Sequence, residues 1–459
     1  MKVDPVPVAR AAATPGFFRQ TLLVYQKETG QSPALWMLLA LLNFIAQIVF
    51  RRELNPGEFG TLNTSLGLIG LMTVPVLALH QAFTHYLARD HAADQLARID
   101  SLRAAALLAT ETFAWAWGAL CLLLVFLLLP LLELPRFSLQ LFTLMNVLVA
   151  VGGLSSCAIC ERGHQFRLWF WLAAASALTR VLIGAGLASQ APWAESGLAA
   201  FLIAGFITLT PALRSTETEL AISLKACRAV WDRDFLLCAA ATFSVLLAIF
   251  LFTGADRIVA QSWFGTTISE RMPVKPGSPG SINTQDYVYV TSFVDWKAFD
   301  AYQTAGLLAR ALLWGAQPLL WILFAQRSRL HRTTPASLAF FWIYLGALLT
   351  GAILLGCLAQ PLSRLFCGGN FPSTALFVPS LAAAMLPLGL LQALGIFALA
   401  SRRYPECFVL GGCGVAYTLL LYLAGRQPQL MPVYMFGGGM VSLMAVLFVG
   451  VVRWGRKQP

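Results

Sequence analysis

The sequence predicts an all-α, polytopic membrane protein with about twelve transmembrane helices in two sets of six. Two observations predict this fold class. Of the 459 residues, 58% are hydrophobic and 12% are charged, whereas an average soluble domain has roughly 25% charged residues. Apolar runs of about twenty residues also recur along the whole chain, and each is long enough to cross a hydrocarbon core of about 30 Å as a helix.

Turn residues and charges separate these apolar runs and give the order of the predicted spans. A polar stretch divides the runs into two equal sets, so the chain is expected to form two halves. The spans of the first half are expected at 34–50, 62–84, 104–130, 138–159, 168–188 and 195–213, and those of the second at 235–255, 301–325, 336–360, 374–400, 407–424 and 431–452.

The basic residues set the expected orientation. Most of them fall in loops on the side that holds both termini, which predicts that this side is cytoplasmic, since Lys and Arg are concentrated in cytoplasmic loops. The predicted organisation is an N-terminal cytoplasmic segment, a first lobe, a cytoplasmic linker, a second lobe with an insertion on its outer face, and a cytoplasmic tail. These parts cover residues 1–33, 34–213, 214–234, 235–452 with the insertion at 266–300, and 453–459.

The outer insertion interrupts the pattern of spans. It is rich in proline and glycine, and these residues are followed by a stretch in which tyrosine and valine alternate: Tyr287, Val288, Tyr289 and Val290. Two interpretations are open: the alternation forms a small hairpin or cap, or the insertion is disordered.

A polar and aromatic stripe marks the predicted eighth span. Arg310 lies about 13 Å into this span, near the middle of the bilayer, where a charged side chain usually faces a bundle interior or a water-filled cavity. Gln303, Arg310, Trp314 and Gln317 recur at spacings of three, four or seven residues and therefore share one face. The stripe predicts a cavity lining; the alternative is that Arg310 braces the bundle through backbone carbonyls.

The first half supplies a similar cation. Arg180 is expected close to mid-depth in the fifth span, so Arg180 and Arg310 would hold an anionic substrate between the lobes, since a guanidinium binds phosphate oxygens in bidentate fashion. Glu111 is the clear acid within a span, and it either carries a coupling proton or pairs with a cation.

Further candidates lie on the first and seventh spans. Asn43, Gln47 and Arg51 recur at four-residue spacing on the first span, where they either line the cavity or support packing. Asp256 and Arg257 are expected to end the seventh span, where they pair with the ends of other helices or extend to the outer headgroups. Asp256 is also a candidate coupling residue.

Several classes of protein are disfavoured by what the sequence lacks. It contains no G-x-x-x-x-G-K-[ST] phosphate loop, so transport would draw on a gradient, on the membrane potential or on a downstream sink for the product. The outer insertion contains no histidine, which disfavours an acid/base enzyme on that face. We therefore expect no enzymatic activity, no cofactor and no metal site. The net charge of +11 is spread over topology-determining loops and does not indicate nucleic-acid binding.

Three stretches carry a resemblance to a known family: Phe50 to Gly60, Asp256 to Ala260 together with Ala301 to Arg310, and Pro361 to Gly368. The first resembles an arginine, leucine, Gly-Pro, acid, aromatic, glycine pattern, from which its Asn55-Pro56-Gly57 departs. The chain resembles the polysaccharide-transporter branch of the multidrug/oligosaccharidyl-lipid/polysaccharide exporter superfamily, which includes O-antigen and exopolysaccharide flippases. Lipid II flippases of this superfamily use an arginine on the eighth helix, which Arg310 resembles in placement.

The resemblance implies two six-helix lobes around a central cavity. It also implies a flippase that moves a lipid-linked oligosaccharide or polysaccharide precursor across the bacterial inner membrane by alternating access. Its expected partners are the lipid-linked glycan and membrane lipids, together with a polysaccharide polymerase and glycosyltransferases. The alternatives are a cation-coupled multidrug exporter, a membrane-embedded glycan polymerase or ligase, and a scaffold for glycosyltransferases. A drug exporter would require more cavity acids than Glu111, and a polymerase would require catalytic groups in the insertion.

Overall fold

A computed structural model describes most of the chain. The residues it describes are 33–55, 57–92, 116–123, 140–148, 166–216, 232–264, 268–273, 287–292, 296–330, 335–368, 372–423 and 430–455. Apart from one strand pair, their regular structure is helical, as the composition predicts.

The described helices form two groups in chain order. The N-terminal helices are α2 (Pro33–Glu53), α3 (Glu58–Ala92), α6 (Phe166–Gln190) and α7 (Ala194–Thr216). The C-terminal helices are α9 (Arg233–Phe264), α10 (Trp296–Leu330), α11 (Pro335–Cys357), α12 (Ala359–Cys367), α13 (Pro372–Ala400), α14 (Tyr404–Leu423) and α15 (Met431–Gly455). Each except α12 coincides with a predicted span, and helical pieces at 116–123 and 140–148 lie within the third and fourth predicted spans. Most of α12 lies between the predicted spans 336–360 and 374–400.

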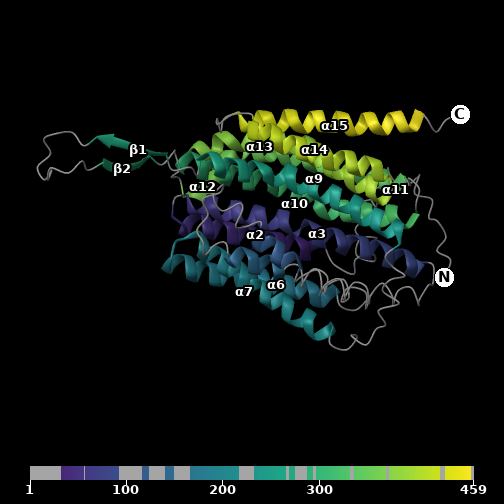
Figure 1. The fold of residues 1–459 in the computed structure, drawn as a ribbon, viewed down its shortest axis with the longest axis horizontal. Coiled ribbons are helices and arrows are strands. Elements are labelled where there is room, and N and C mark those ends of the chain that lie inside the picture. Colours follow the sequence, from purple (N-terminus) through teal and green to yellow (C-terminus); the bar gives the residue numbers. More distant parts are fainter. Residues whose placement is uncertain are drawn as a thin grey trace, which may run out of the picture.

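The helices run roughly along the long axis of the molecule (Figure 1). Within the N-terminal helices, α6 packs on α2 and α7. Within the C-terminal helices, α14 packs on α9, and α10 packs on α13. The two groups meet mainly where α3 lies along α9, with further contacts from α10 to α3 and α2. We call this boundary the seam.

Five of the described helices are long and apolar enough to cross a membrane. These stretches are Glu58–Phe83, Arg233–Gln261, Ser373–Ala400, Tyr404–Leu423 and Met431–Val452. The bent pair Phe341–Cys357 and Ala359–Cys367 makes a sixth if it is counted as one span. The chain is therefore a multi-pass integral membrane protein.

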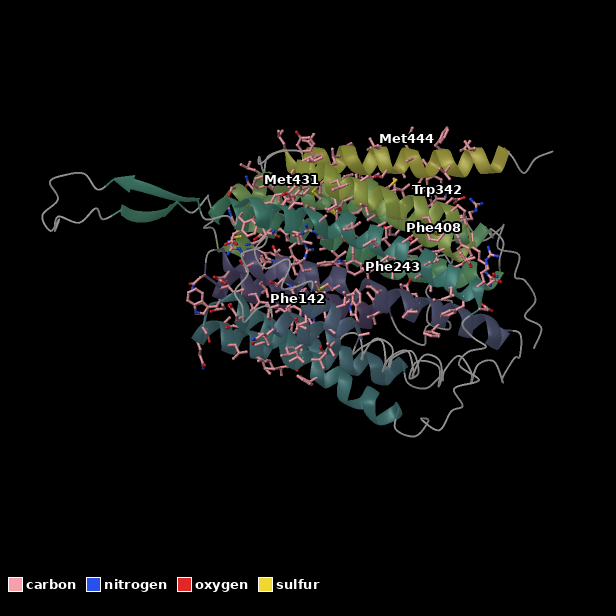
Figure 2. All side chains as sticks on the ribbon, viewed as in Figure 1. Phe142, Phe243, Trp342, Phe408, Met431 and Met444 are labelled. Atoms are coloured by element: carbon pink, nitrogen blue, oxygen red, sulfur yellow. The ribbon has the colours of Figure 1, made fainter. Side chains whose placement is uncertain are left out.

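Large apolar side chains also cover the outside of the bundle. Trp342 on α11, Phe408 on α14 and Met444 on α15 are 60%, 41% and 64% exposed, and Figure 2 shows Met444 on the outer side of its helix. A water-soluble protein rarely exposes so continuous an apolar surface, whereas lipid accommodates it.

The outer insertion contains a β-hairpin. Strand β1 (Ile268–Pro273) pairs antiparallel with β2 (Tyr287–Ser292), with Ile268 opposite Ser292. The alternating Tyr-Val sequence thus forms a strand, which supports the hairpin interpretation. The hairpin protrudes beyond one end of the bundle, which we call the hairpin end (Figure 1).

Two predicted spans differ from the structure. The predicted span 336–360 is bent by 71° between α11 and α12, and Pro361, which lacks a backbone N–H, lies in the first turn of α12. The predicted span 235–255 is too short, because α9 continues to Phe264. This extension places Asp256 and Arg257 inside the helix.

Candidate functional site

The most deeply buried cation of the described chain lies between α9 and α10. Arg310 is 1% exposed, and its Nε donates a hydrogen bond to the carbonyl oxygen of Thr253 at 2.5 Å. Its Nη2 forms an ion pair with Oδ2 of Asp256. Arg310 lies fourteen residues into α10, about 21 Å along the helix axis from Trp296. The prediction of a buried cation is confirmed. The bond to the Thr253 carbonyl agrees with the alternative in which Arg310 braces the bundle, and a role of Arg310 in lining a cavity stays a prediction.

The carboxylate of Asp256 has a second donor. The hydroxyl of Tyr302, which lies eight residues before Arg310 on α10, donates to Oδ2 of Asp256 at 2.9 Å. Asp256 is fully buried, and its Oδ1 accepts no hydrogen bond from the residues that the structure describes. The prediction that Asp256 extends towards headgroups or helix ends is therefore wrong: α9 turns this carboxylate towards α10.

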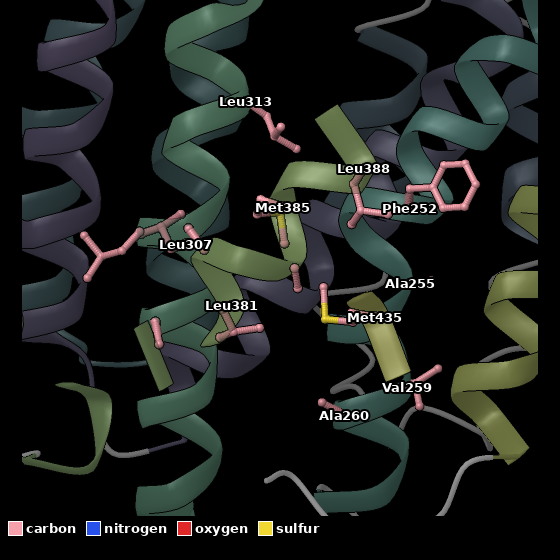
Figure 3. Close-up of a cluster of buried hydrophobic side chains, with 14 of the residues drawn as sticks. Phe252, Ala255, Val259, Ala260, Leu307, Leu313, Leu381, Met385, Leu388 and Met435 are labelled. Atoms are coloured by element: carbon pink, nitrogen blue, oxygen red, sulfur yellow. The ribbon is translucent and has the colours of Figure 1, made fainter. Parts of the chain in front are cut away.

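Apolar side chains surround this ion pair. Figure 3 shows Phe252, Ala255 and Val259 of α9, Leu307 and Leu313 of α10, Leu381, Met385 and Leu388 of α13, and Met435 of α15 in one cluster. The sulfur of Met435 lies 3.5 Å from the Tyr302 hydroxyl. Because charges interact more strongly in such low-dielectric surroundings, the pairing of Arg310 with Asp256 fixes the relative positions of α9 and α10.

Arg257 points in another direction from Asp256. Its side chain is 7% exposed, and its Cδ lies 3.7 Å from the position that a Cβ on Gly67 of α3 would occupy. The backbone carbonyl of Arg257 accepts from Thr64 at 3.4 Å and from Gln303 at 3.5 Å. Its guanidinium makes no hydrogen bond or ion pair with the described residues, and its buried Nε is without a partner among them. The headgroup prediction for Arg257 is therefore also wrong, because its side chain is buried at the seam.

Sequence reasoning missed Arg257 as a site residue, although a signal was present. Thr253, Arg257 and Gln261 recur every four residues on α9, which is the spacing that identified the stripe on α10. The predicted end of the span at residue 255 hid the repeat, since it left Arg257 outside the helix.

A second polar cluster joins the two helix groups nearer the hairpin end. Asp300 of α10 accepts from the backbone amides of Gly57 at 2.8 Å and Gly60 at 3.1 Å, both at the start of α3. Nη1 of Arg51 lies 3.7 Å from Asp300, and Nε of Arg51 donates to Thr304 at 3.1 Å. A carboxylate is favourable at a helix N-terminus, where amides are otherwise unpaired. We call these five residues the Asp300 cluster.

Close backbone packing accompanies the Asp300 cluster. A Cβ on Gly60 would lie 2.0 Å from a ring atom of Phe299, so only glycine permits this approach of α3 to α10. Arg52 also donates from Nη2 to the carbonyl oxygen of Leu365 on α12 at 2.6 Å. The N-terminal and C-terminal helices are thus bonded at the hairpin end of the seam, about 15 Å along α10 from Arg310.

The structure does not bring Arg180 to Arg310. Arg180 is half-buried on α6, where its Nε and Nη2 donate to the backbone and hydroxyl oxygens of Ser176 at 3.4 Å. Its guanidinium lies 5.0 Å from the ring centroid of Phe201 on α7. These contacts are within the N-terminal helices, and a role of Arg180 in substrate binding stays a prediction.

The other predicted residues are distributed along α2 and α10. Gln303 is buried, with an Oε1 that has no partner among the described residues, and Gln47 has such an Oε1 on α2. Asn43 is partly buried on α2, whereas Trp314 is 48% exposed. Gln317 lies within α10, but its side chain is outside the described part. Glu111 also lies outside the described residues.

Comparison with known proteins gives a result for the fold alone. No family model matches the sequence, and no curated protein matches it. A solved eukaryotic MATE transporter, AtDTX14, superposes with a TM-score of 0.65 at 9% identity over 94% of this chain and 96% of that chain. The Vibrio cholerae MATE transporter VcmN gives 0.59 at 13% identity over 93% and 97%.

The lipid II flippase MurJ, in an inward closed conformation, superposes with a TM-score of 0.59 at 15% identity over 91% of this chain and 86% of that chain. A multidrug resistance MATE transporter of the MOP superfamily, in an inward-facing conformation, gives 0.58 at 11% identity over 94% and 100%. MOP is the exporter superfamily that the sequence resembles. The chain therefore has the fold of the membrane transporters of the MOP superfamily.

Proposed function

We propose that the chain translocates a lipid-linked oligosaccharide or polysaccharide precursor across the bacterial inner membrane by alternating access. The observation that carries the proposal is the positive charge buried at the seam, on Arg257, and next to it between α9 and α10, on Arg310. Arg257 and Arg310 are both more than nine-tenths buried, and Asp256 is the one carboxylate in direct contact with either among the described residues. The surplus positive charge favours an anionic cargo, and a lipid diphosphate is such a cargo.

In this proposal the two helix groups rock against each other at the seam. The Asp300 cluster holds the hairpin end of the seam together, so it must separate for the cargo to leave on that side. Arg180, Gln303 and Gln47 would face the cargo during part of the cycle, while Arg310 would add positive charge from its ion pair with Asp256. Protonation of Glu111 or Asp256 would bias the exchange. The lipid tail stays in the bilayer while the hydrophilic glycan crosses between the groups.

A cation-coupled multidrug exporter is the second candidate, because three of the structures reported above are MATE transporters. A buried acid on α9, Asp256, is the feature that favours it. However, Asp256 already pairs with Arg310 and accepts from Tyr302, which leaves little negative charge for a cationic drug or a coupling cation. The charge balance therefore favours the flippase. A polymerase or ligase would need catalytic groups in the insertion, where Glu270, Asp286 and Asp295 are the candidate acids, and no observation favours that function.

The decisive experiment compares cells that lack the gene with cells that carry the intact gene or Arg310→Glu. Accumulation of a lipid-linked glycan on the inner face, with loss of surface polysaccharide, is expected in the deletion strain. Arg310→Glu should reproduce the loss if the variant protein is still present in the membrane at normal levels. Normal glycan together with increased sensitivity to cationic drugs in the deletion strain would favour the multidrug alternative.

A further inference from the structure

We infer that Arg257, on α9, is the residue that binds a phosphate group of the transported lipid diphosphate directly. Arg310 then acts as a fixed positive charge behind it. This inference rests on the proposed function, since it assigns the anion-binding residue of the same transport site.

The first step of the argument concerns unused hydrogen-bond donors. A guanidinium has five N–H donors, and Arg310 uses its Nε and Nη2 on Thr253 and Asp256. Arg257 donates to no residue in the described ranges, although 93% of its surface is covered. An unpaired charge buried away from water costs several kcal/mol. A ligand that brings its own negative charge would supply the missing partner.

The second step concerns position. Arg257 faces Gly67 across the seam, whereas Arg310 and Asp256 bond each other within the C-terminal helices. Separation of α3 from α9 would therefore uncover Arg257 while leaving the Arg310–Asp256 pair intact. Gly67 presents no side chain to the guanidinium, so a phosphate entering the seam meets no steric barrier from that residue.

The third step concerns charge. Arg257 is repelled by Arg310 and attracted by Asp256. Two cations and one anion leave these three groups with one surplus positive charge. The orientation of α9 is also fixed, because Thr64 and Gln303 both bond the backbone carbonyl of Arg257. These bonds position the backbone of α9 and leave the guanidinium itself available. A planar guanidinium can bind two phosphate oxygens at once, which a lysine ammonium cannot do.

The test uses the full-length protein in phosphatidylcholine nanodiscs, titrated with a polyprenyl diphosphate. Arg257→Gln should weaken binding about 10- to 100-fold, because one charge-assisted bidentate contact is lost. Arg257→Lys should give an intermediate loss, since it keeps the charge without the fork. Arg233→Gln is the matched control, because Arg233 is exposed on the same helix, and it should bind like the wild type. Unchanged binding by Arg257→Gln would overturn the inference.

Thermal unfolding without ligand separates binding from a structural role. Arg257→Gln removes an unpaired buried charge, so its Tm should equal or exceed that of the wild type. A lowered Tm would mean that Arg257 has a structural partner and would contradict the inference. Phosphatidylglycerol tests whether Arg257 distinguishes the cargo from an ordinary anionic lipid. If phosphatidylglycerol displaces the polyprenyl diphosphate at equal concentration, Arg257 binds lipid headgroups in general and the assignment to the cargo fails.

The two proposals fail in different ways. If the wild-type protein neither binds a polyprenyl diphosphate nor moves a lipid-linked glycan in vesicles, the proposed function is wrong. If the wild type does both and Arg257→Gln equals it, only the assignment of Arg257 is wrong.

Discussion

Arg310 and Asp256 form an ion pair in which the two side chains are 1% and 0% exposed, and the residues lie 54 positions apart in the sequence. The pair joins α9, which precedes the β-hairpin in the sequence, to α10, which follows it. Any rearrangement of the C-terminal helices must either keep this contact or expose both charges to another polar partner.

Removal of either partner of this pair should destabilise the protein. Asp256→Leu leaves the Arg310 charge buried, and Arg310→Met leaves the Asp256 charge buried, each at a cost of roughly 3–5 kcal/mol. The double variant should be considerably more stable than either single variant, since neither charge of the pair is left buried without the other. Denaturant or thermal unfolding in detergent measures the stability of the wild type, the two single variants and the double variant. If the stability loss of the double variant equals the sum of the two single losses, the two side chains are not coupled.

The hydroxyl of Tyr302 should contribute measurably to stability. Tyr302→Phe removes the 2.9 Å hydrogen bond to Asp256, and a hydrogen bond to a charged group is worth roughly 1.5–3 kcal/mol. Tyr417→Phe is the matched control, because the Tyr417 side chain is equally buried but its hydroxyl has no hydrogen-bond partner in the described ranges. The same unfolding assay should show a loss for Tyr302→Phe and none for Tyr417→Phe.

Loss of the Asp300 carboxylate should open the hairpin end of the seam. Asp300→Asn removes the negative charge that faces Arg51 and leaves one oxygen where two now accept from Gly57 and Gly60. Spin labels at Glu53 and Arg364, with the native reactive cysteines replaced by serine, report the distance between α2 and α12 across the seam.

In the Asp300→Asn variant, the distribution of that distance should shift to longer values. Asp234→Asn is the control, since this exposed acid lies at the start of α9, far from the hairpin end, and it should leave the distribution unchanged. An identical distribution in both variants would mean that Asp300 does not hold the seam closed.

A methyl group at position 60 should disrupt the contact of α3 with α10. In Gly60→Ala the new Cβ would lie 2.0 Å from the Phe299 ring, and overpacking of this kind typically costs about 1–3 kcal/mol. Gly412→Ala should be neutral or stabilising, because a Cβ there meets no atom within 4 Å and alanine favours the helix. Unfolding measurements test both, and Phe299→Leu should partly rescue Gly60→Ala by removing the ring.

Particular residues show how far sequence reasoning reaches in this protein. Apolar length predicted the helices. The depth of Arg310 in its span predicted a side chain that faces the bundle interior or a cavity, and the structure shows it buried. The same reasoning placed Asp256 and Arg257 at a helix end, because the hydropathy of the sequence falls at these charges. A hydropathy profile cannot distinguish the end of a helix from a charged residue that is neutralised inside a helix bundle. Asp300 was missed for a similar reason, since its partners are backbone amides that any residue can supply.

The sequence alone determined that the chain is helical, apolar enough for lipid and interrupted by an insertion with a strand pattern, because these properties depend on local composition and periodicity. Only the tertiary structure decided the partners of the charged residues. Asp256 and Arg257 are adjacent in the chain, but successive residues on a helix point about 100° apart. Helix packing therefore directs Asp256 to Arg310 and Arg257 to the seam, and that choice depends on helix rotations that the sequence pattern does not contain.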